Sequence, residues 1–389
     1  MKCIARIALV AVAVGCAAGC VGDDDSPAAS VDLGLPAHFP PPTVPDDNPL
    51  TADKIELGRH LFYDVRLSVN EAISCSSCHQ QQFAFADEHS VSLGATGDIG
   101  VLNAPSLTNV IYASPLTWAH AGISAIEDQL KGPMFGESPL EMGITGAEET
   151  ILARLRGEPV YDELFAAVYP DETGELITLD RVRFALASFV RSLVSYRAPF
   201  DAFLAGDMAA ISEGARRGSE LFYSPRLNCG SCHSGFAFTS ATRSSVTTGQ
   251  PVSPFHNIGL YNVDGEGAYP DAAVGLIGET GVARDMGRFR VPTLRNVGLT
   301  APYMHDGSVA TLEDVLAIYE NGGRDVTDGP HAGDGTVNPL RSNDLPSFEL
   351  TEAERTDVIA FLRSLSDVSF TTDPAHANPW ADSTPELAD

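Results

Sequence analysis

Cysteine and basic residues are scarce in this chain, and each shortage excludes a class of protein. Only seven of the 389 residues are cysteine, and three of them, Cys3, Cys16 and Cys20, lie near the N-terminus. The other four belong to two short motifs, so none is left for a disulfide framework. Lys and Arg number 24 against 52 Asp and Glu, which gives a formal net charge of −28. This acidic balance argues against binding of nucleic acid or of an anionic lipid surface.

Long apolar runs are also absent, except for one at the N-terminus. Lys2 and Arg6 precede an apolar stretch that ends in the small residues Ala17-Ala18-Gly19-Cys20. This order is typical of an export signal rather than of a membrane-spanning helix. The last four residues resemble a bacterial lipobox, which implies cleavage before Cys20 and lipidation of its thiol; plain secretion is the alternative. We expect residues 1–20 to be a lipoprotein-type signal peptide and the mature protein to be periplasmic, held to a membrane by its lipid alone.

The four remaining cysteines form one motif twice. CSSCHQQQFAFAD begins at Cys75 and CGSCHSGFAFTS begins at Cys229. The similar segments LFYDVRL and LFYSPRL precede them, starting at Leu61 and Leu221. The repeat indicates an internal duplication. Each copy holds the C-x-x-C-H pattern that is typical of covalent c-type haem attachment.

The spacing within each copy suits the chemistry of haem attachment. Two thiols one helical turn apart can each add to a vinyl group of haem, and the next residue places an imidazole on the iron. A zinc site would need further Cys or His ligands near each copy, and a thioredoxin-like pair would need a βαβ unit; the sequence offers neither. We therefore predict two haem c groups, held by Cys75, Cys78 and His79 and by Cys229, Cys232 and His233.

Apolar residues at three-to-four spacing predict a mostly α-helical protein. Thr351 and Glu354 form a capping box, and Gly322 with Gly323 gives a helix stop. Long Gly-, Pro- and Asn-rich loops between the helices suit the wrapping of a haem. The expected organisation is two cytochrome c-like haem domains, related by duplication. Its parts are a flexible, acidic and Pro-rich linker at 21–50, an N-terminal haem domain at 51–205, a C-terminal haem domain at 206–370 and a polar tail at 371–389.

Across residues 50–370 the chain resembles the bacterial dihaem cytochrome c peroxidases and the related MauG-type enzymes. The motifs that carry the resemblance are LGRHLFYDVRLS, CSSCH, LNAPSLTNV, the isolated Trp118, DQLKGP, PLEMG, CGSCH and VPTLRNVGLTAPYMHDG. The order of these motifs also matches. The resemblance implies peroxide chemistry at the N-terminal haem, with electrons arriving through the second haem from a small cytochrome c or a cupredoxin.

The same resemblance implies roles for three polar or aromatic residues. Gln129 in DQLKGP and Glu141 in PLEMG correspond to the distal acid–base pair, and Trp118 corresponds to an electron conduit between the haems. Bound peroxide must lose a proton from one oxygen and gain one on the other before the O–O bond breaks. A glutamate beside an amide can move that proton.

The resemblance also implies one calcium ion where the two domains meet. Asn103, Thr300 and Pro302 correspond to its ligands, through a side-chain amide and backbone carbonyls. Ligation by oxygen alone suits calcium. An ordinary turn residue is the alternative for Asn103.

Two positions depart from the peroxidase pattern. Ala95 stands where reductively activated peroxidases have a histidine that blocks the peroxide-binding iron, so we expect that iron to be open; His89 and His120 are the histidines that could replace it. At the second haem, Tyr319 stands where peroxidases have a methionine, as in the MauG-type enzymes. Met304 and Met286 are the alternative ligands there.

These features predict an oxidoreductase of the cytochrome c peroxidase type that reduces hydrogen peroxide to water. A MauG-type oxidase, which oxidises a protein or small molecule, is the first alternative, and Tyr319 and Ala95 favour it. A non-catalytic dihaem electron-transfer cytochrome is the second.

Overall fold

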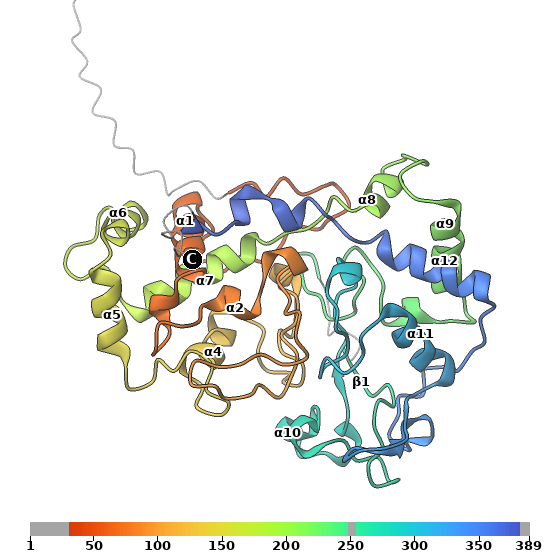
Figure 1. Ribbon diagram of the computed structural model, residues 1–389. Coiled ribbons are helices and arrows are strands. Elements are labelled where there is room, and N and C mark those ends of the chain that lie inside the picture. The colour runs from red at the N-terminus through yellow and green to blue at the C-terminus, as the bar shows by residue number, and fades with distance from the viewer. Residues whose placement is uncertain (1–30, 248–253, 382–389) are drawn as a thin grey trace, which may run out of the picture.

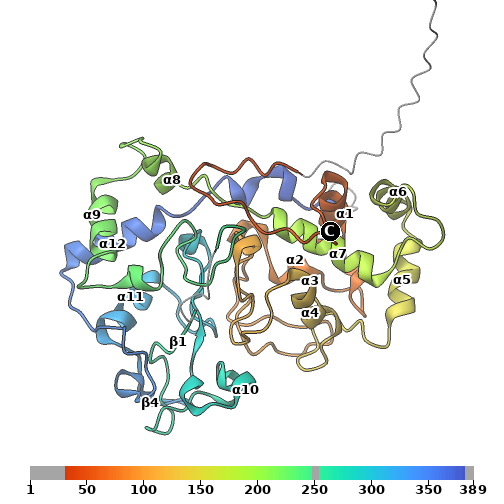
Figure 2. The same cartoon turned by 180° about the vertical axis from the view of Figure 1, so that it is seen from behind.

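The computed structural model describes residues 31–247 and 254–381. The signal peptide and the lipidation of Cys20 therefore lie outside the described residues. Helices dominate, and each of the strands is only two residues long, as the mostly α prediction required. Figures 1 and 2 show two lobes side by side, one built from the first half of the chain and one from the second. Within the described ranges, no helix is long and apolar enough to cross a membrane.

The elements follow one another with long loops between them. The N-terminal lobe holds α1 (Ala52–Phe62), α2 (Cys75–Cys78), α3 (Ile126–Gln129), α4 (Lys131–Phe135), α5 (Glu148–Arg156), α6 (Pro159–Val168) and α7 (Leu179–Ser192). The remainder comprises α8 (Pro199–Leu204), α9 (Glu213–Phe222), β1 (Phe255–His256), α10 (Ile277–Thr280), β2 (Phe289–Arg290), α11 (Leu312–Asn321), β3 (Asp325–Val326), β4 (Gly333–Asp334) and α12 (Glu352–Arg363). Strand β1 pairs antiparallel with β2, and β3 pairs antiparallel with β4.

The internal duplication is visible in how the helices pack. Helix α1 precedes the first C-x-x-C-H motif and packs on α7, while α9 precedes the second motif and packs on α12. A glycine lies at each crossing. A Cβ at Gly58 would overlap the backbone carbonyl of Ala185, and a Cβ at Gly218 would overlap that of Asp357. Both helix pairs therefore approach closely only because these two positions lack a side chain.

Local signals fix the ends of two helices as the sequence predicted. Thr351 caps α12 and forms a reciprocal capping box with Glu354. Gly322 ends α11 in the left-handed conformation, with a φ of 70° that glycine adopts without strain.

The segment expected to be a flexible linker packs on the folded body from residue 31 onwards. Phe39 is 5% exposed, and its ring lies 4.9 Å from that of Phe236 and 6.1 Å from that of Tyr112. The hydroxyl of Tyr112 also donates to the carbonyl of Pro40 over 2.7 Å. Tyr112 belongs to the N-terminal lobe and Phe236 to the C-terminal lobe. The segment of residues 31–50, which we call the strap, therefore joins the two lobes.

Residues 371–381, expected to be part of a polar tail, run back across the N-terminal lobe. Arg59 donates to the carbonyl of Ala377 over 2.8 Å, and Tyr63 donates to that of His376 over 2.7 Å. The indole of Trp380 donates to the carbonyl of His60 over 3.0 Å. The described part of the tail is thus a docked segment of the N-terminal lobe.

Candidate functional site

One cavity of about 660 Å³ reaches both C-x-x-C-H motifs. Its walls come from both lobes and are mostly apolar. Ligand and cofactor pockets are typically concave and apolar, with volumes of about 300–1,000 Å³. The size and lining of the cavity therefore suit large, flat, apolar groups.

The two motif histidines have the same orientation. His79 caps the C-terminal end of α2, and its Nδ1–H donates to the carbonyl of Phe85 over 3.0 Å. His233 makes the equivalent bond to the carbonyl of Phe238 over 3.1 Å. Burial lowers the pKa of both imidazoles, that of His233 to about 4, so each is neutral. A neutral histidine whose Nδ1–H is held by a carbonyl presents Nε2 to a metal, as an axial haem ligand must.

The motif cysteines have the properties of attachment sites rather than of a redox pair. Burial raises the pKa of Cys75 and of Cys229 to about 12, so both stay protonated at neutral pH. Reactive thiols of oxidoreductases have lowered pKa values instead. The protein thus fits two covalently bound haems, one at each motif.

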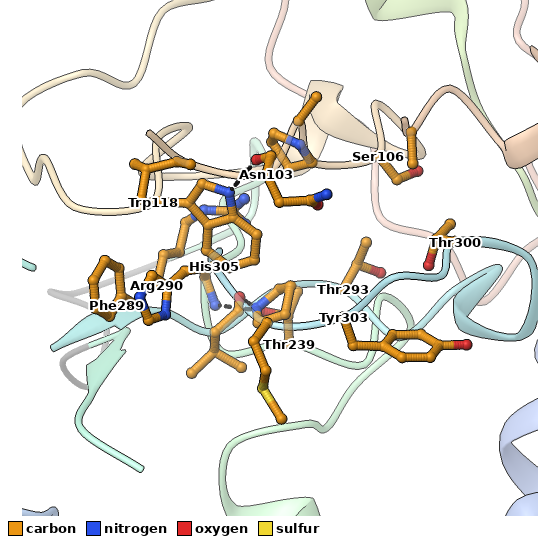
Figure 3. Close-up of a pocket in the computed structure, with 18 of the residues that line it drawn as sticks. Asn103, Ser106, Trp118, Thr239, Phe289, Arg290, Thr293, Thr300, Tyr303 and His305 are labelled. Carbon is orange, nitrogen blue, oxygen red and sulfur yellow. Dashed lines mark hydrogen bonds between the residues drawn. The ribbon is translucent and has the colours of Figure 1, made fainter. Parts of the chain in front are cut away.

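Two polar side chains line the cavity, one with a charge and one with a ring nitrogen that no described protein group pairs with. Arg290 is buried, and desolvation lowers its pKa to about 10. Its Nε–H donates to the carbonyl of Thr117 over 3.1 Å, but no acidic side chain among the described residues pairs with its charge. The ring of His305 stacks on Phe289 with centroids 3.5 Å apart, and its Nε2 is buried without a hydrogen bond among the described residues. Figure 3 shows both beside Trp118. A cation and a free imidazole nitrogen suit the carboxylates that haem carries.

Sequence reasoning did not identify either of these residues. His305 lies inside the PYMHDG motif, directly after Met304, which was the residue predicted as a possible haem ligand. Arg290 has no local signal at all, because its role depends on the pairing of β1 with β2 and on the position of Trp118.

Trp118 lines the same cavity as the two motifs. It is 9% exposed, and its indole N–H donates to the carbonyl of Asn103 over 2.8 Å. The guanidinium of Arg290 lies 5.6 Å from the centre of the indole ring. These contacts hold the indole ring in one orientation at the cavity wall. Its role as an electron conduit stays a prediction.

Glu141 and Gln129 both line the cavity on the side of the first motif. Desolvation raises the pKa of the Glu141 carboxyl. The loop at Ala95 holds the glutamate in place, since the Ala95 N–H donates to the carbonyl of Glu141 over 2.7 Å. The Asp98 carboxylate accepts the N–H of Leu140 over 3.0 Å. Ala95, which stands where some peroxidases have a blocking histidine, thus supports the backbone of Glu141.

The two histidines that could have replaced the blocking ligand do not line this cavity. His89 is 71% exposed and bonds to Asp87 over 3.0 Å. His120 is 48% exposed and lies 3.4 Å from Glu279. In the described part of the chain, the histidines that line the cavity are His79, His233, His256 and His305.

At the second motif, Tyr319 on α11 lines the cavity. Its pKa is raised, first by burial and then by the nearby thiols of Cys229 and Cys232. Met304 also lines the cavity, whereas Met286 is not among its lining residues. Tyr319 and Met304 therefore both lie where they could face the second haem.

His256 approaches the second motif from β1. Its Nε2 lies 3.8 Å from the Cys232 sulfur, and its Nδ1 lies 3.6 Å from Asp344. These three side chains could in principle hold a metal ion. Because Cys232 is required for haem attachment, we assign no further metal to them.

The predicted calcium ligands lie on the same cavity. The Asn103 amide donates to the carbonyls of His89 and Ser90 over 3.1 and 3.3 Å, so its side-chain oxygen remains available as a ligand. Thr300 and Pro302 also line the cavity. The calcium site stays a prediction.

Comparisons with known proteins agree with this architecture. The family model of the di-haem cytochrome c peroxidases matches residues 52–209. Cytochrome-c peroxidase IdrP1 of Denitromonas iodatirespirans is 34% identical over 379 residues, which cover 93% of this chain and 92% of that protein. The MauG methylamine utilization protein of Methylophilus methylotrophus is 32% identical, covering 83% of this chain and 85% of MauG.

Solved structures give the same result. The crystal structure of a MauG-like protein associated with microbial copper homeostasis is 43% identical, with a TM-score of 0.87, and covers 90% of this chain and 100% of that one. The diheme peroxidase BthA of Burkholderia thailandensis, 21% identical with a TM-score of 0.63 over 90% of this chain and 93% of BthA, shares the fold. With two attachment motifs on one cavity and relatives that match nearly its whole length, the chain belongs to the dihaem cytochrome c peroxidase and MauG family.

Proposed function

We propose that the protein is a dihaem peroxidase that reduces hydrogen peroxide to water at the N-terminal haem. Electrons come from a small cytochrome c or a cupredoxin and pass through the second haem. The observation that supports this most is the position of Glu141, a carboxyl of raised pKa on the cavity that the first C-x-x-C-H motif also lines.

The haem irons, when bound, supply the site for peroxide and the electrons that cleave it. The protein moves the protons. A carboxylate oxygen of Glu141 takes the proton of one peroxide oxygen and returns it to the other, so that the latter leaves as water. The side-chain amide of Gln129 can donate a hydrogen bond to peroxide and orient it. The apolar walls exclude bulk water, which strengthens both interactions.

Trp118 and the groups around it act between the two haem sites. Its indole N–H is fixed by the carbonyl of Asn103, and the Arg290 cation lies near its ring. Arg290 and His305 can each bind a carboxylate of haem and so set the position of the cofactors relative to the indole.

A MauG-type oxidase is the second candidate, and one residue favours it. Tyr319 lies near Cys229 and Cys232, where an anionic tyrosinate ligand would favour ferric iron more than methionine does. The 43% identical structure is also that of a MauG-like protein. In this reading, the electrons for peroxide come from an organic or protein substrate.

Anaerobic peroxide titration with and without a reduced small cytochrome c tests the proposal. A peroxidase oxidises the cytochrome in a ratio of two per peroxide and turns over repeatedly. A MauG-type oxidase reacts with peroxide but oxidises the cytochrome poorly. When no substrate is present, its two-electron oxidised state is long-lived. An electron carrier does not react with peroxide rapidly, and that result would contradict both proposals.

We further propose that the mature chain is periplasmic and lipidated at Cys20, because the leader resembles a lipobox. Mass spectrometry of the membrane fraction should find a diacylated N-terminal cysteine and two haems per chain. A soluble chain with an intact leader would refute the anchor.

A further inference from the structure

Aromatic rings lead from the cavity toward the surface of the C-terminal lobe. We call Phe289, His305, Tyr269 and Tyr261 the aromatic path. The stacked pair Phe289 and His305 lines the cavity; the ring of Tyr269 lies 6.1 Å from His305, and the ring of Tyr261 lies 5.6 Å from Tyr269. The gaps between neighbouring rings are short enough for an electron to tunnel from a tyrosine to the cavity, with the phenyl and imidazole rings as the intervening medium.

The inner end of the aromatic path is joined to Trp118. The indole N–H donates to the carbonyl of Asn103 over 2.8 Å, and the Asn103 N–H donates to the carbonyl of His305 over 2.8 Å. Trp118 shares one apolar cluster with Phe289, Tyr269 and Tyr261. Electrons can therefore pass between Trp118 and His305 through two hydrogen bonds.

The outer end lies just below the surface. Tyr261 is 6% exposed, its ring is 5.9 Å from that of the exposed His331, and the guanidinium of Arg324 lies 4.5 Å from it. Its hydroxyl donates to a carboxylate oxygen of Asp306 over 2.6 Å. By contrast, the Tyr269 hydroxyl donates to the neutral amide oxygen of Asn257 over 2.8 Å.

This difference decides which tyrosine can be oxidised. Removing an electron from a phenol makes it a strong acid, so the oxidation is favourable only when a nearby base takes the proton. Asp306 can accept the proton of Tyr261, whereas an amide cannot accept that of Tyr269. The aromatic path thus ends at its most readily oxidised ring.

We propose that Tyr261 is a redox-active tyrosine, and that electron-rich aromatic reductants too large for the cavity are oxidised above it, beside His331 and Arg324. This inference rests on the proposed reaction with peroxide. Reduction of one hydrogen peroxide to two waters takes two electrons and two protons. Tyr261 gives one of the electrons and passes its hydroxyl proton to Asp306. The other electron would come by way of the second haem site, which the small redox donor of the proposed function restores, and solvent supplies the two protons. One electron from the external reductant, with return of the proton from Asp306, restores Tyr261.

Rapid-freeze electron paramagnetic resonance of the two-haem protein tests the proposal. The protein is mixed with hydrogen peroxide in the absence of a donor, once with ordinary and once with ring-deuterated tyrosine. A tyrosyl radical should form, its spectrum should narrow with the deuterated label, and Tyr261→Phe should lose it. Tyr169→Phe is the matched control. Like Tyr261, Tyr169 has an arginine over its ring, Arg181 at 4.3 Å, but it lies in the N-terminal lobe and does not line the cavity. The Tyr169→Phe variant should give the same radical signal as the wild type.

Spin trapping followed by peptide mapping of the wild-type protein gives a readout that does not depend on a variant that folds. The adduct should be found on the peptide that contains Tyr261. Peroxide consumption with a reduced small cytochrome c is measured on the same preparation. If the protein consumes peroxide but gives no tyrosyl signal, or one that persists in Tyr261→Phe, the redox role of Tyr261 is refuted and the peroxidase proposal stands. If peroxide does not react at all, both fail.

Discussion

At the scale of single residues, Glu141 carries the proposed proton transfer, and the structure offers a matched control for it. Glu141→Gln keeps the shape of the side chain but cannot take a proton. We expect it to slow the reaction with hydrogen peroxide by about 10²-fold. Glu137→Gln, on the same loop but outside the cavity lining, should react at the wild-type rate. Stopped-flow absorbance, with haem content checked for each variant, measures both; equal rates for the wild type and Glu141→Gln would remove this carboxyl from the mechanism.

The raised pKa of Glu141 predicts where the rate falls with pH. Only the ionised carboxylate can take a proton from peroxide. Desolvation raises the pKa of Glu141 above the pKa of about 4.3 that an ordinary glutamate has. The carboxyl therefore becomes protonated, and the reaction slows, at a higher pH than it would with an ordinary glutamate. The rate should rise with pH through this raised pKa and then level off. Glu141→Gln should lack that step, and a wild-type profile flat from acid to neutral pH would contradict the assignment.

Single residues were predictable from sequence where the chemistry is local. The C-x-x-C-H motifs place two thiols and an imidazole within one turn, so their role does not depend on the rest of the fold. Arg290 and His305 depend on tertiary contacts with Trp118, Asn103 and Phe289, and no spacing in the sequence reports such contacts.

At the scale of elements, the two glycine crossings should be equally sensitive. Gly218→Ala places a methyl group against the carbonyl of Asp357 and forces α9 away from α12, and Gly58→Ala does the same to α1 and α7. We expect each to lower the free energy of unfolding by about 2–3 kcal/mol. Gly278→Ala in α10 meets only ordinary contacts and should be neutral or slightly stabilising. Denaturant melts compare the three; an unchanged midpoint for Gly218→Ala would mean that the helices do not cross as described.

The docked C-terminal segment gives a second test at this scale. Trp380→Ala removes the hydrogen bond to His60, the ring contact with Tyr161 and the stacking of Arg66 at 5.0 Å. We expect a loss of about 2 kcal/mol in stability. Val368→Ala, at a side chain that is 64% exposed, is the control and should cost little. Thermal unfolding of the full chain measures the stability of both variants. Equal unfolding temperatures for Trp380→Ala and the wild type would mean that this segment is a tail that does not stabilise the N-terminal lobe.

The helical elements were predictable because their apolar spacing and caps are local signals. The strap and the docked segment were not. Phe39 and Trp380 are isolated apolar residues in polar, Pro-containing stretches, and they show no periodicity. Their packing depends on surfaces formed by distant segments, such as the rings of Tyr112, Phe236 and Tyr161.

At the scale of the whole molecule, the duplication places two haem sites on one cavity, which Trp118 also lines. The sequence predicted the two sites and their order, because the motifs repeat. It did not predict that the aromatic path would lead from this cavity to the surface. The excess of acidic residues extends over the chain as a whole, and a basic electron donor would be attracted by it at low ionic strength.

In the proposed mechanism, peroxide meets Glu141 at an open first haem site, without a prior reduction step. The most direct measurement mixes the fully oxidised two-haem protein with hydrogen peroxide in a stopped-flow spectrometer and compares it with protein in which the second haem has first been reduced. Because Ala95 supplies no nitrogen ligand and neither His89 nor His120 lines the cavity, the oxidised protein should react at once. A reaction that begins only after reduction of the second haem would contradict the account.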